Sequence, residues 1–163
     1  NALFELYVAK LLEPVARAHG WAMKVQTGAR DCLHPEGGTA GVFATFPDIQ
    51  LCSGDRVGLV IDTKWKRLED RARDPKMNIV QADIYQMMAY ARLYRCDRLM
   101  LLYPDATGAR PNEAHRYGVH GGREMLALGR IDLSASPDVT AKSLSDIARR
   151  LLAGYQPPIR QVS

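Results

Sequence analysis

The spacing of hydrophobic positions predicts an amphipathic helix at the start of the chain. Apolar residues recur there every three or four positions, as one face of an α-helix requires. These positions are Leu3, Phe4, Tyr7, Val8, Leu11, Leu12 and Val15. We therefore expect a helix over about residues 2–18 that closes near Gly20. Weak alternation over residues 21–26 predicts a first strand, and the glycine-rich residues 28–41 predict a loop.

Two apolar segments rich in β-branched residues follow, and they predict a β-hairpin. They are Phe46–Leu51 and Val60–Lys66, with Gly54-Asp55 between them as the turn. After a loop over residues 67–77, a second helical stripe predicts a helix that is capped by Asn78 and runs to about Tyr94. The stripe consists of Val80, Ile84, Met87, Met88, Ala91 and Tyr94.

The rest of the chain predicts a buried strand, a hairpin and a short helix. The continuously apolar run Arg98–Tyr103, ended by Pro104, is typical of a central strand reached by a parallel crossover. Residues 104–116 predict a polar loop. The segments Tyr117–His120 and Glu124–Leu133 predict a hairpin around Gly121-Gly122, and Ser143–Leu152 predicts a terminal helix. The pattern as a whole indicates an α/β protein.

Length and composition restrict the number of domains and the class of protein. A chain of 163 residues with 47% hydrophobic content is typical of one globular domain, so we expect a single domain over residues 1–163. No run approaches the roughly 20 apolar residues of a membrane span, and no signal peptide begins the chain, so we expect a cytoplasmic protein. Because the first residue is not Met, we expect the C-terminal part of a longer protein. Cys32, Cys52 and Cys96 lack the spacing of a zinc site and are expected to be reduced thiols.

Charged residues interrupt the predicted hairpin strands. Asp48 stands in an otherwise core-like strand, and Asp62 follows the apolar residues 57–61, where a lone carboxylate carries a large desolvation cost. Lys64 lies two residues beyond Asp62 and so on the same face of the strand. Two carboxylates beside a lysine predict a site for a divalent metal. In the structural alternative, each aspartate pairs with a basic residue, and Lys64 is that partner.

Basic residues gather on and just after the second of these strands. They are Lys64, Lys66, Arg67, Arg71, Arg73 and Lys76. Together with a net charge of +4 and a pI near 9.1, they are compatible with a polyanionic partner such as DNA. Because Glu69, Asp70 and Asp74 are interleaved with them, a solvated loop is the alternative.

The order of these elements and the charged motif resemble the PD-(D/E)xK nuclease superfamily. Its restriction-endonuclease-like core runs helix, three strands, helix, strand, with a mixed central sheet flanked by helices. Pro47-Asp48 matches the first half of the motif and Asp62-Thr63-Lys64, 14 residues after Asp48, matches the second. The segment Gln86–Tyr90 is similar to the QxxxY motif of the RecB-like branch.

Within that superfamily the chain is most similar to the nuclease domain of McrC. McrC is the endonuclease subunit of the modified-cytosine restriction system McrBC. The likeness is carried by Phe4-Glu5, by the strand Val60–Lys66 and by the helical segment Asp83–Ala91, and it covers about residues 1–103. It implies a Mg²⁺-dependent DNA endonuclease, in which Mn²⁺ can substitute, directed to modified DNA by a McrB-like GTPase.

The resemblance also implies a role for each site residue. Asp48 and Asp62 would hold the metal with the backbone carbonyl of Thr63, and Glu5 would bind it through water or extend the acidic cluster. Lys64 would orient or deprotonate the attacking water and offset charge in the transition state.

Gln86 and Tyr90 would fix the site or contact the DNA backbone. In the structural alternatives, the helix dipole favours Glu5 at its position, and Gln86 and Tyr90 are an i,i+4 packing pair. The chain has no P-loop signature GxxxxGK[ST], so target choice is expected to lie in the partner.

Two other functions stay open at the level of sequence. In the first, the domain is a nuclease of another RecB-like branch that works in repair or recombination. In the second, it is a DNA-binding module that kept the fold without the chemistry. The intact Asp48, Asp62 and Lys64 argue against the second. Members of the RecB-like branch that carry an iron–sulfur cluster bind it with four cysteines, and the three here cannot supply them.

Overall fold

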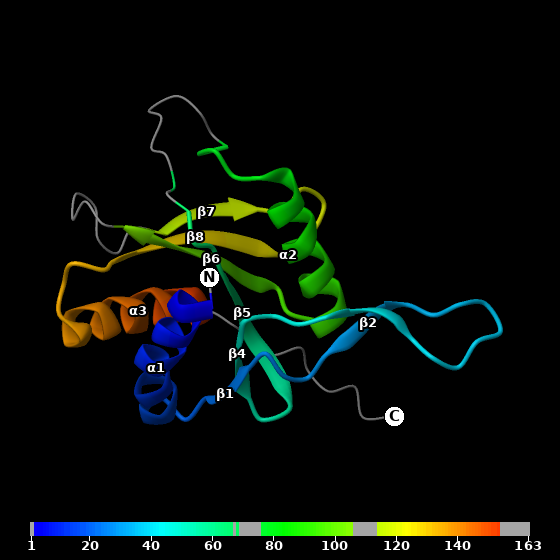
Figure 1. Cartoon of the computed structure of the whole chain (residues 1–163), viewed down its shortest axis with the longest axis horizontal. Coiled ribbons are helices and arrows are strands. Elements are labelled where there is room, and N and C mark those ends of the chain that lie inside the picture. The colour runs from blue at the N-terminus through cyan, green and yellow to red at the C-terminus, as the bar shows by residue number, and fades with distance from the viewer. Residues whose placement is uncertain (1, 67, 69–75, 106–113, 154–163) are drawn as a thin grey trace.

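A computed structural model of the chain describes residues 2–66, 68, 76–105 and 114–153 (Figure 1). In chain order the elements are α1 (Ala2–Ala18), β1 (Ala22–Val25), β2 (Arg30–Leu33), β3 (Val42–Thr45), β4 (Ile49–Ser53), β5 (Arg56–Thr63), α2 (Gln81–Tyr94), β6 (Arg98–Asp105), β7 (Ala114–Gly118), β8 (Met125–Asp132) and α3 (Pro137–Leu152). Three of the predicted basic residues, Arg67, Arg71 and Arg73, lie outside the described residues.

Six strands form one mixed sheet in the order β1-β4-β5-β6-β8-β7. The pairs β1–β4, β4–β5 and β7–β8 are antiparallel, which confirms both predicted hairpins. Strand β6 runs parallel to β5 and β8, so the predicted parallel crossover through α2 is also confirmed. The fold is therefore a mixed α/β architecture, as expected.

Helices cover both faces of this sheet (Figure 1). Helices α1 and α3 pack on one face and α2 packs on the other. Side chains of β6 alternate between the two: Met100 and Leu102 join the core under α1 and α3, whereas Leu99 and Leu101 join the core under α2. A strand buried on both faces needs a continuous apolar run, and this explains why β6 was recognisable in the sequence.

The predicted loop over residues 28–41 is wrong in part. It contains β2, which pairs with β3 in a separate two-stranded ribbon that extends from the body of the protein (Figure 1). The side chains of β2 are all exposed, so neither face carries the hydrophobic alternation that marks a strand packed on a core. The ribbon is tied to α2 at its base, where the Tyr94 hydroxyl donates to the Thr45 carbonyl over 2.9 Å.

Several predicted boundaries are also wrong. Asn78 does not cap α2, because its φ of 59° places it in a left-handed turn, and Val80 precedes the helix without a side-chain cap. Helix α3 begins at Pro137, six residues before the predicted start, with the hydroxyl of Ser136 accepting from the Val139 N–H.

The limits of several strands differ from expectation as well. The predicted strand Phe46–Leu51 is β4 over Ile49–Ser53, and the predicted strand Val60–Lys66 is β5 over Arg56–Thr63. Strand β6 continues through Pro104 to Asp105, because β5 has ended there and only β8 still flanks it, so the missing N–H is tolerated. Strand β7 begins at Ala114, inside the predicted polar loop. None of the helices in the described part of the chain is long and apolar enough to cross a membrane.

Candidate active site

Asp48 and Asp62 lie next to each other at one end of the β4–β5 hairpin. Ile49 pairs with Ile61 in the last rung of the ladder, and extending the register by one residue sets Asp48 opposite Asp62. Asp62 is only 3% exposed, because the apolar strand β5 runs through the middle of the sheet, while Asp48 is half-buried. The hairpin therefore holds two carboxylates side by side in a poorly solvated place, as predicted.

Thr63 binds Asp48 in a way that the sequence did not indicate. Its backbone N–H and its hydroxyl both donate to Oδ2 of Asp48, each over 2.7 Å. The backbone carbonyl of Thr63, predicted as a metal ligand, stays a prediction. Thr63 thus orients one of the two carboxylates through its N–H and side chain.

Lys64 connects Asp62 to α2. Its Nζ lies 2.7 Å from Oδ2 of Asp62 and 3.2 Å from Oδ1 of Asp83, and it donates to Oε1 of Gln86 over 3.0 Å. Burial lowers the pKa of the ammonium, but Asp62 and Asp83 outweigh it, and the pKa is raised overall. The structural alternative, an ion pair between Asp62 and Lys64, is thus present in the structure, and the ammonium is held in its charged form.

Gln86 and Tyr90 join the site from α2. The side-chain amide of Gln86 donates to the Tyr90 hydroxyl over 2.8 Å, and that hydroxyl donates to the Phe46 carbonyl over 3.2 Å. Burial raises the pKa of Tyr90, with Asp62 adding to the shift, so its hydroxyl stays neutral. The two residues are an i,i+4 pair, but they also bind Lys64 and the backbone just before Asp48, which a packing pair alone would not do.

Glu5 comes to the same place from α1. It is 8% exposed, and burial raises its pKa first, followed by the negative charges of Asp48 and Asp62. The helix-dipole alternative does not account for the raised pKa, because the negative charges of both aspartates also act on Glu5. Three acidic side chains therefore repel one another around one end of the hairpin.

The charge distribution fits a cation beside Asp62. Burial is the largest cause that raises the pKa of Asp62 to about 6, and Asp48 raises it further while Lys64 lowers it. Oδ2 of Asp62 is buried and, among the described residues, has no donor aligned for a hydrogen bond, although the Lys64 ammonium is 2.7 Å away. Carboxylate oxygens are the ligands that Mg²⁺ and Mn²⁺ prefer.

A complete ligand cage is not assembled in the described part of the chain. No three His, Cys, Asp or Glu side chains come close enough there to hold a metal ion by themselves. Cys32, Cys52 and Cys96 are free thiols, as predicted. Any metal at Asp48 and Asp62 would therefore need water or substrate oxygens to complete its coordination, which is common for Mg²⁺.

The sequence analysis assigned Asp83 no role in the site, although it named Lys66 among the basic residues there. Asp83, in the first turn of α2, contacts Lys64 and also accepts from Lys66, whose Nζ is 2.6 Å from Oδ2. The Nζ of Lys66 also lies 6.0 Å from the centre of the Tyr103 ring. Asp83 precedes Gln86 by three residues, so the helical period alone places both on one face. That signal was available in the sequence.

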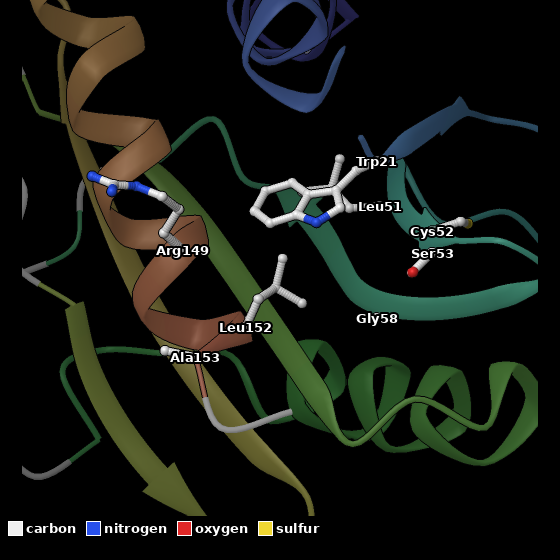
Figure 2. Close-up of a pocket in the computed structure, with 8 residues that line it drawn as sticks. All are labelled: Trp21, Leu51, Cys52, Ser53, Gly58, Arg149, Leu152 and Ala153. Carbon is white, nitrogen blue, oxygen red and sulfur yellow. The ribbon is translucent and has the colours of Figure 1, made fainter. Parts of the chain in front are cut away.

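A cavity of about 430 Å³ lies away from these residues, near the turn of the β4–β5 hairpin (Figure 2). Its lining includes Trp21, Cys52 and Gly58, with Arg149 and Leu152 contributed by the end of α3. The acidic end of the hairpin is the opposite end. The candidate site lies where β4, β5, α1 and α2 meet, and not at this cavity.

Comparison with known proteins identifies a family and similar solved structures. The family model described as "McrBC 5-methylcytosine restriction system component" matches residues 1–104. No curated protein matches the chain. A chain in the structure described as the "refined half-complex from tetradecameric assembly of Thermococcus gammatolerans McrB AAA+ hexamers with bound McrC" is similar over 93% of this chain, with a TM-score of 0.67 and 12% identity. The match spans 33% of that other chain, and at this identity it speaks for the fold alone.

Proposed function

The chain belongs to the family of McrBC 5-methylcytosine restriction system components, and from that premise we propose that it is a PD-(D/E)xK nuclease domain that hydrolyses DNA phosphodiester bonds with Mg²⁺. This is the same family that the sequence resembles in its motifs. The observation that supports the proposal most is the convergence of Asp48, Asp62 and Lys64 at one end of a hairpin, with Gln86 from α2 bound to Lys64.

In this proposal Asp48 and Asp62 hold the metal. Both offer hard oxygen ligands, and Asp62 sits where burial makes an uncompensated charge unfavourable. Bound Mg²⁺ would neutralise phosphate charge and lower the pKa of a bound water. The Thr63 carbonyl and Glu5 are proposed as further contacts, Glu5 through water. Thr63 also fixes the orientation of Asp48 through its N–H and hydroxyl.

Lys64 supplies positive charge to the reacting phosphate. Because Asp62 and Asp83 raise its pKa, Lys64 is a proton donor in the metal-free state and not a ready base. Its ammonium would therefore orient the attacking water and offset negative charge in the transition state. Gln86 holds the ammonium in position, and Tyr90 anchors Gln86 to the backbone before Asp48.

We propose that DNA and a McrB-like GTPase are the partners. The similar solved structure is described as McrB AAA+ hexamers with bound McrC, and this chain carries no P-loop of its own. Target choice would lie in that partner. The chain alone should then bind DNA weakly and without sequence preference, through phosphate contacts that weaken steeply as salt rises.

Plasmid cleavage tests this function. Supercoiled DNA with or without 5-methylcytosine is incubated with the chain, with a McrB-like GTPase and GTP, and with either Mg²⁺ or EDTA. We expect cleavage of methylated plasmid that needs both Mg²⁺ and the partner, and that the Asp48→Ala variant lacks.

Three other results would contradict the proposal. Cleavage that ignores methylation and needs no partner would favour a repair or recombination nuclease. DNA binding without cleavage under every condition would favour a binding module. Cleavage that persists in EDTA would exclude the metal mechanism.

A further inference from the structure

Asp83 forms ion pairs with two lysine side chains of the candidate site. Lys64 lies 3.2 Å from Oδ1 and Lys66 lies 2.6 Å from Oδ2, so each oxygen of the carboxylate faces a different ammonium. The Asp83 side chain is 14% exposed. Burial raises its pKa, but the hydrogen bonds from Lys66 and Lys64 prevail and lower it overall. Asp83 is therefore an ionised carboxylate held in one orientation.

Lys64 is shared between this carboxylate and a second one on a different element. Asp62 on β5 lies 2.7 Å from Nζ, while Asp83 and Gln86 approach the same atom from α2. A cation that binds Asp62 must displace or share its contact with the ammonium, because both compete for one carboxylate. Without another partner, Lys64 would then be left partly buried and unpaired, which is costly.

We propose that Asp83 is a positioning residue that retains Lys64 beside the site when Asp62 takes up a metal ion. The inference rests on the proposed function, because it takes Asp62 to be a ligand. As the contact with Asp62 loosens, the ammonium keeps Asp83 and Gln86 and stays next to the phosphate position. Lys66 contributes by holding the other oxygen of Asp83, so that Oδ1 continues to face Lys64.

A double-mutant cycle on metal affinity tests this role without any cleavage assay. Calorimetry gives the Mn²⁺ affinity, without DNA, of the wild type, Asp83→Asn, Lys64→Met and the double variant. Lys64→Met should bind Mn²⁺ more tightly than wild type, because the competing ammonium is gone. Asp83→Asn should weaken Mn²⁺ binding roughly five-fold or more when Lys64 is present, since the ammonium then relies on Asp62. In the Lys64→Met background the same change should have much less effect.

Two matched controls separate this coupling from a general loss of negative charge. Asp146→Asn removes a carboxylate on α3 that pairs with Arg149, so it should leave Mn²⁺ affinity unchanged. Asp83→Glu restores the charge and should recover most of the wild-type affinity. Equal effects of Asp83→Asn with and without Lys64 would overturn the positioning role. No Mn²⁺ binding by the wild type would overturn the proposed function itself, and the inference with it.

A measurement on the unmodified site keeps the inference testable if Asp83→Asn does not fold. The ¹⁵N signal of the Lys64 ammonium, assigned by comparison with Lys64→Arg, reports how well the group is shielded from solvent exchange. If Asp83 retains the ammonium, the signal should shift on saturation with Mg²⁺ but stay protected. Loss of protection on adding Mg²⁺ would show that Lys64 is released to solvent and would overturn the inference.

Discussion

Thr63 donates two hydrogen bonds to a single oxygen of Asp48, one from its backbone N–H and one from its hydroxyl, each 2.7 Å long. Thr63 is the last residue of β5 and is 1% exposed, while Asp48 immediately precedes β4. Hydrogen bonds to an ionised acceptor are stronger than those between neutral groups. The pair therefore closes the acidic end of the hairpin and sets the orientation of one carboxylate.

Replacing Thr63 by valine should destabilise the chain. Thr63→Val keeps the shape and the backbone N–H but removes the hydroxyl, and a hydrogen bond to a charged group contributes about 1.5–3 kcal/mol. Urea unfolding should show a loss of that order, whereas Thr63→Ser, which keeps the hydroxyl, should lose less. A Thr63→Val variant as stable as wild type would mean that the hydroxyl does not hold Asp48.

Metal binding should require the two aspartates together. The site offers carboxylate oxygens, so Mn²⁺ or Mg²⁺ should bind and Zn²⁺ should not be required. In a calorimetric titration, the Asp48→Ala, Asp62→Ala double variant should lose the Mn²⁺ binding of the wild type. Unchanged binding by that variant would move the site elsewhere in the chain.

Asp62 should make the stability of the metal-free chain depend on pH. Burial, with Asp48 adding to it, raises the pKa of Asp62 from 3.8 to about 6. The folded chain then holds this proton more tightly than the unfolded chain does. The contribution of Asp62 to the free energy of unfolding therefore falls as pH rises from about 4 to about 6. The total change is roughly 3 kcal/mol at most.

The Asp62→Asn variant tests this pH dependence, because asparagine has no carboxyl group to titrate. The variant should gain stability relative to wild type across that window and at pH 8 be at least as stable, although inactive. Lys64 is not stranded by the change, because Asp83 and Gln86 still bind it. Urea unfolding of both proteins in EDTA from pH 4 to pH 8 gives the difference. A variant that has a lower free energy of unfolding than wild type at pH 8 would show instead that the ion pair with Lys64 is net stabilising.

The parts of the fold that were predictable are those whose burial leaves a pattern in the chain. Strand β6 lies between two layers of helices and so is apolar throughout, and the stripe of α1 follows directly from its single buried face. Strand β2 was missed because it has no buried face. Helix α3 was placed too late because its Ser136 cap was overlooked.

The sequence predicted those residues of the candidate site that lie close together in the chain. Asp62 and Lys64 are two residues apart in the chain, so the period of the predicted strand places them together, although β5 itself ends at Thr63. The contact between Lys64 and Asp83 joins the residue that follows β5 to α2, and it depends on how that helix packs across the sheet. Periodicity describes each element separately and cannot supply such a contact, although it does group Asp83 with Gln86.

Lys64→Ala should separate catalysis from DNA binding. Removing a group that orients water and stabilises the transition state should lower cleavage by the assembled complex on the order of 10²-fold or more. DNA affinity should change little, because one basic side chain is a small part of the phosphate contact. Cleavage and DNA binding are measured for the same variant, with Lys142→Ala as a control that removes an exposed lysine from α3.

Two results would contradict this assignment of Lys64. Cleavage at the wild-type rate would make Lys64 a structural residue. Its short contacts to Asp62 and Asp83 would then serve only to stabilise the fold. Equal losses of DNA binding and cleavage would make it a phosphate-binding residue and would favour the DNA-binding module over the enzyme. Only a large loss of cleavage with DNA affinity preserved places the ammonium at the reacting phosphate, because a contact made equally in the ground state would weaken binding as well.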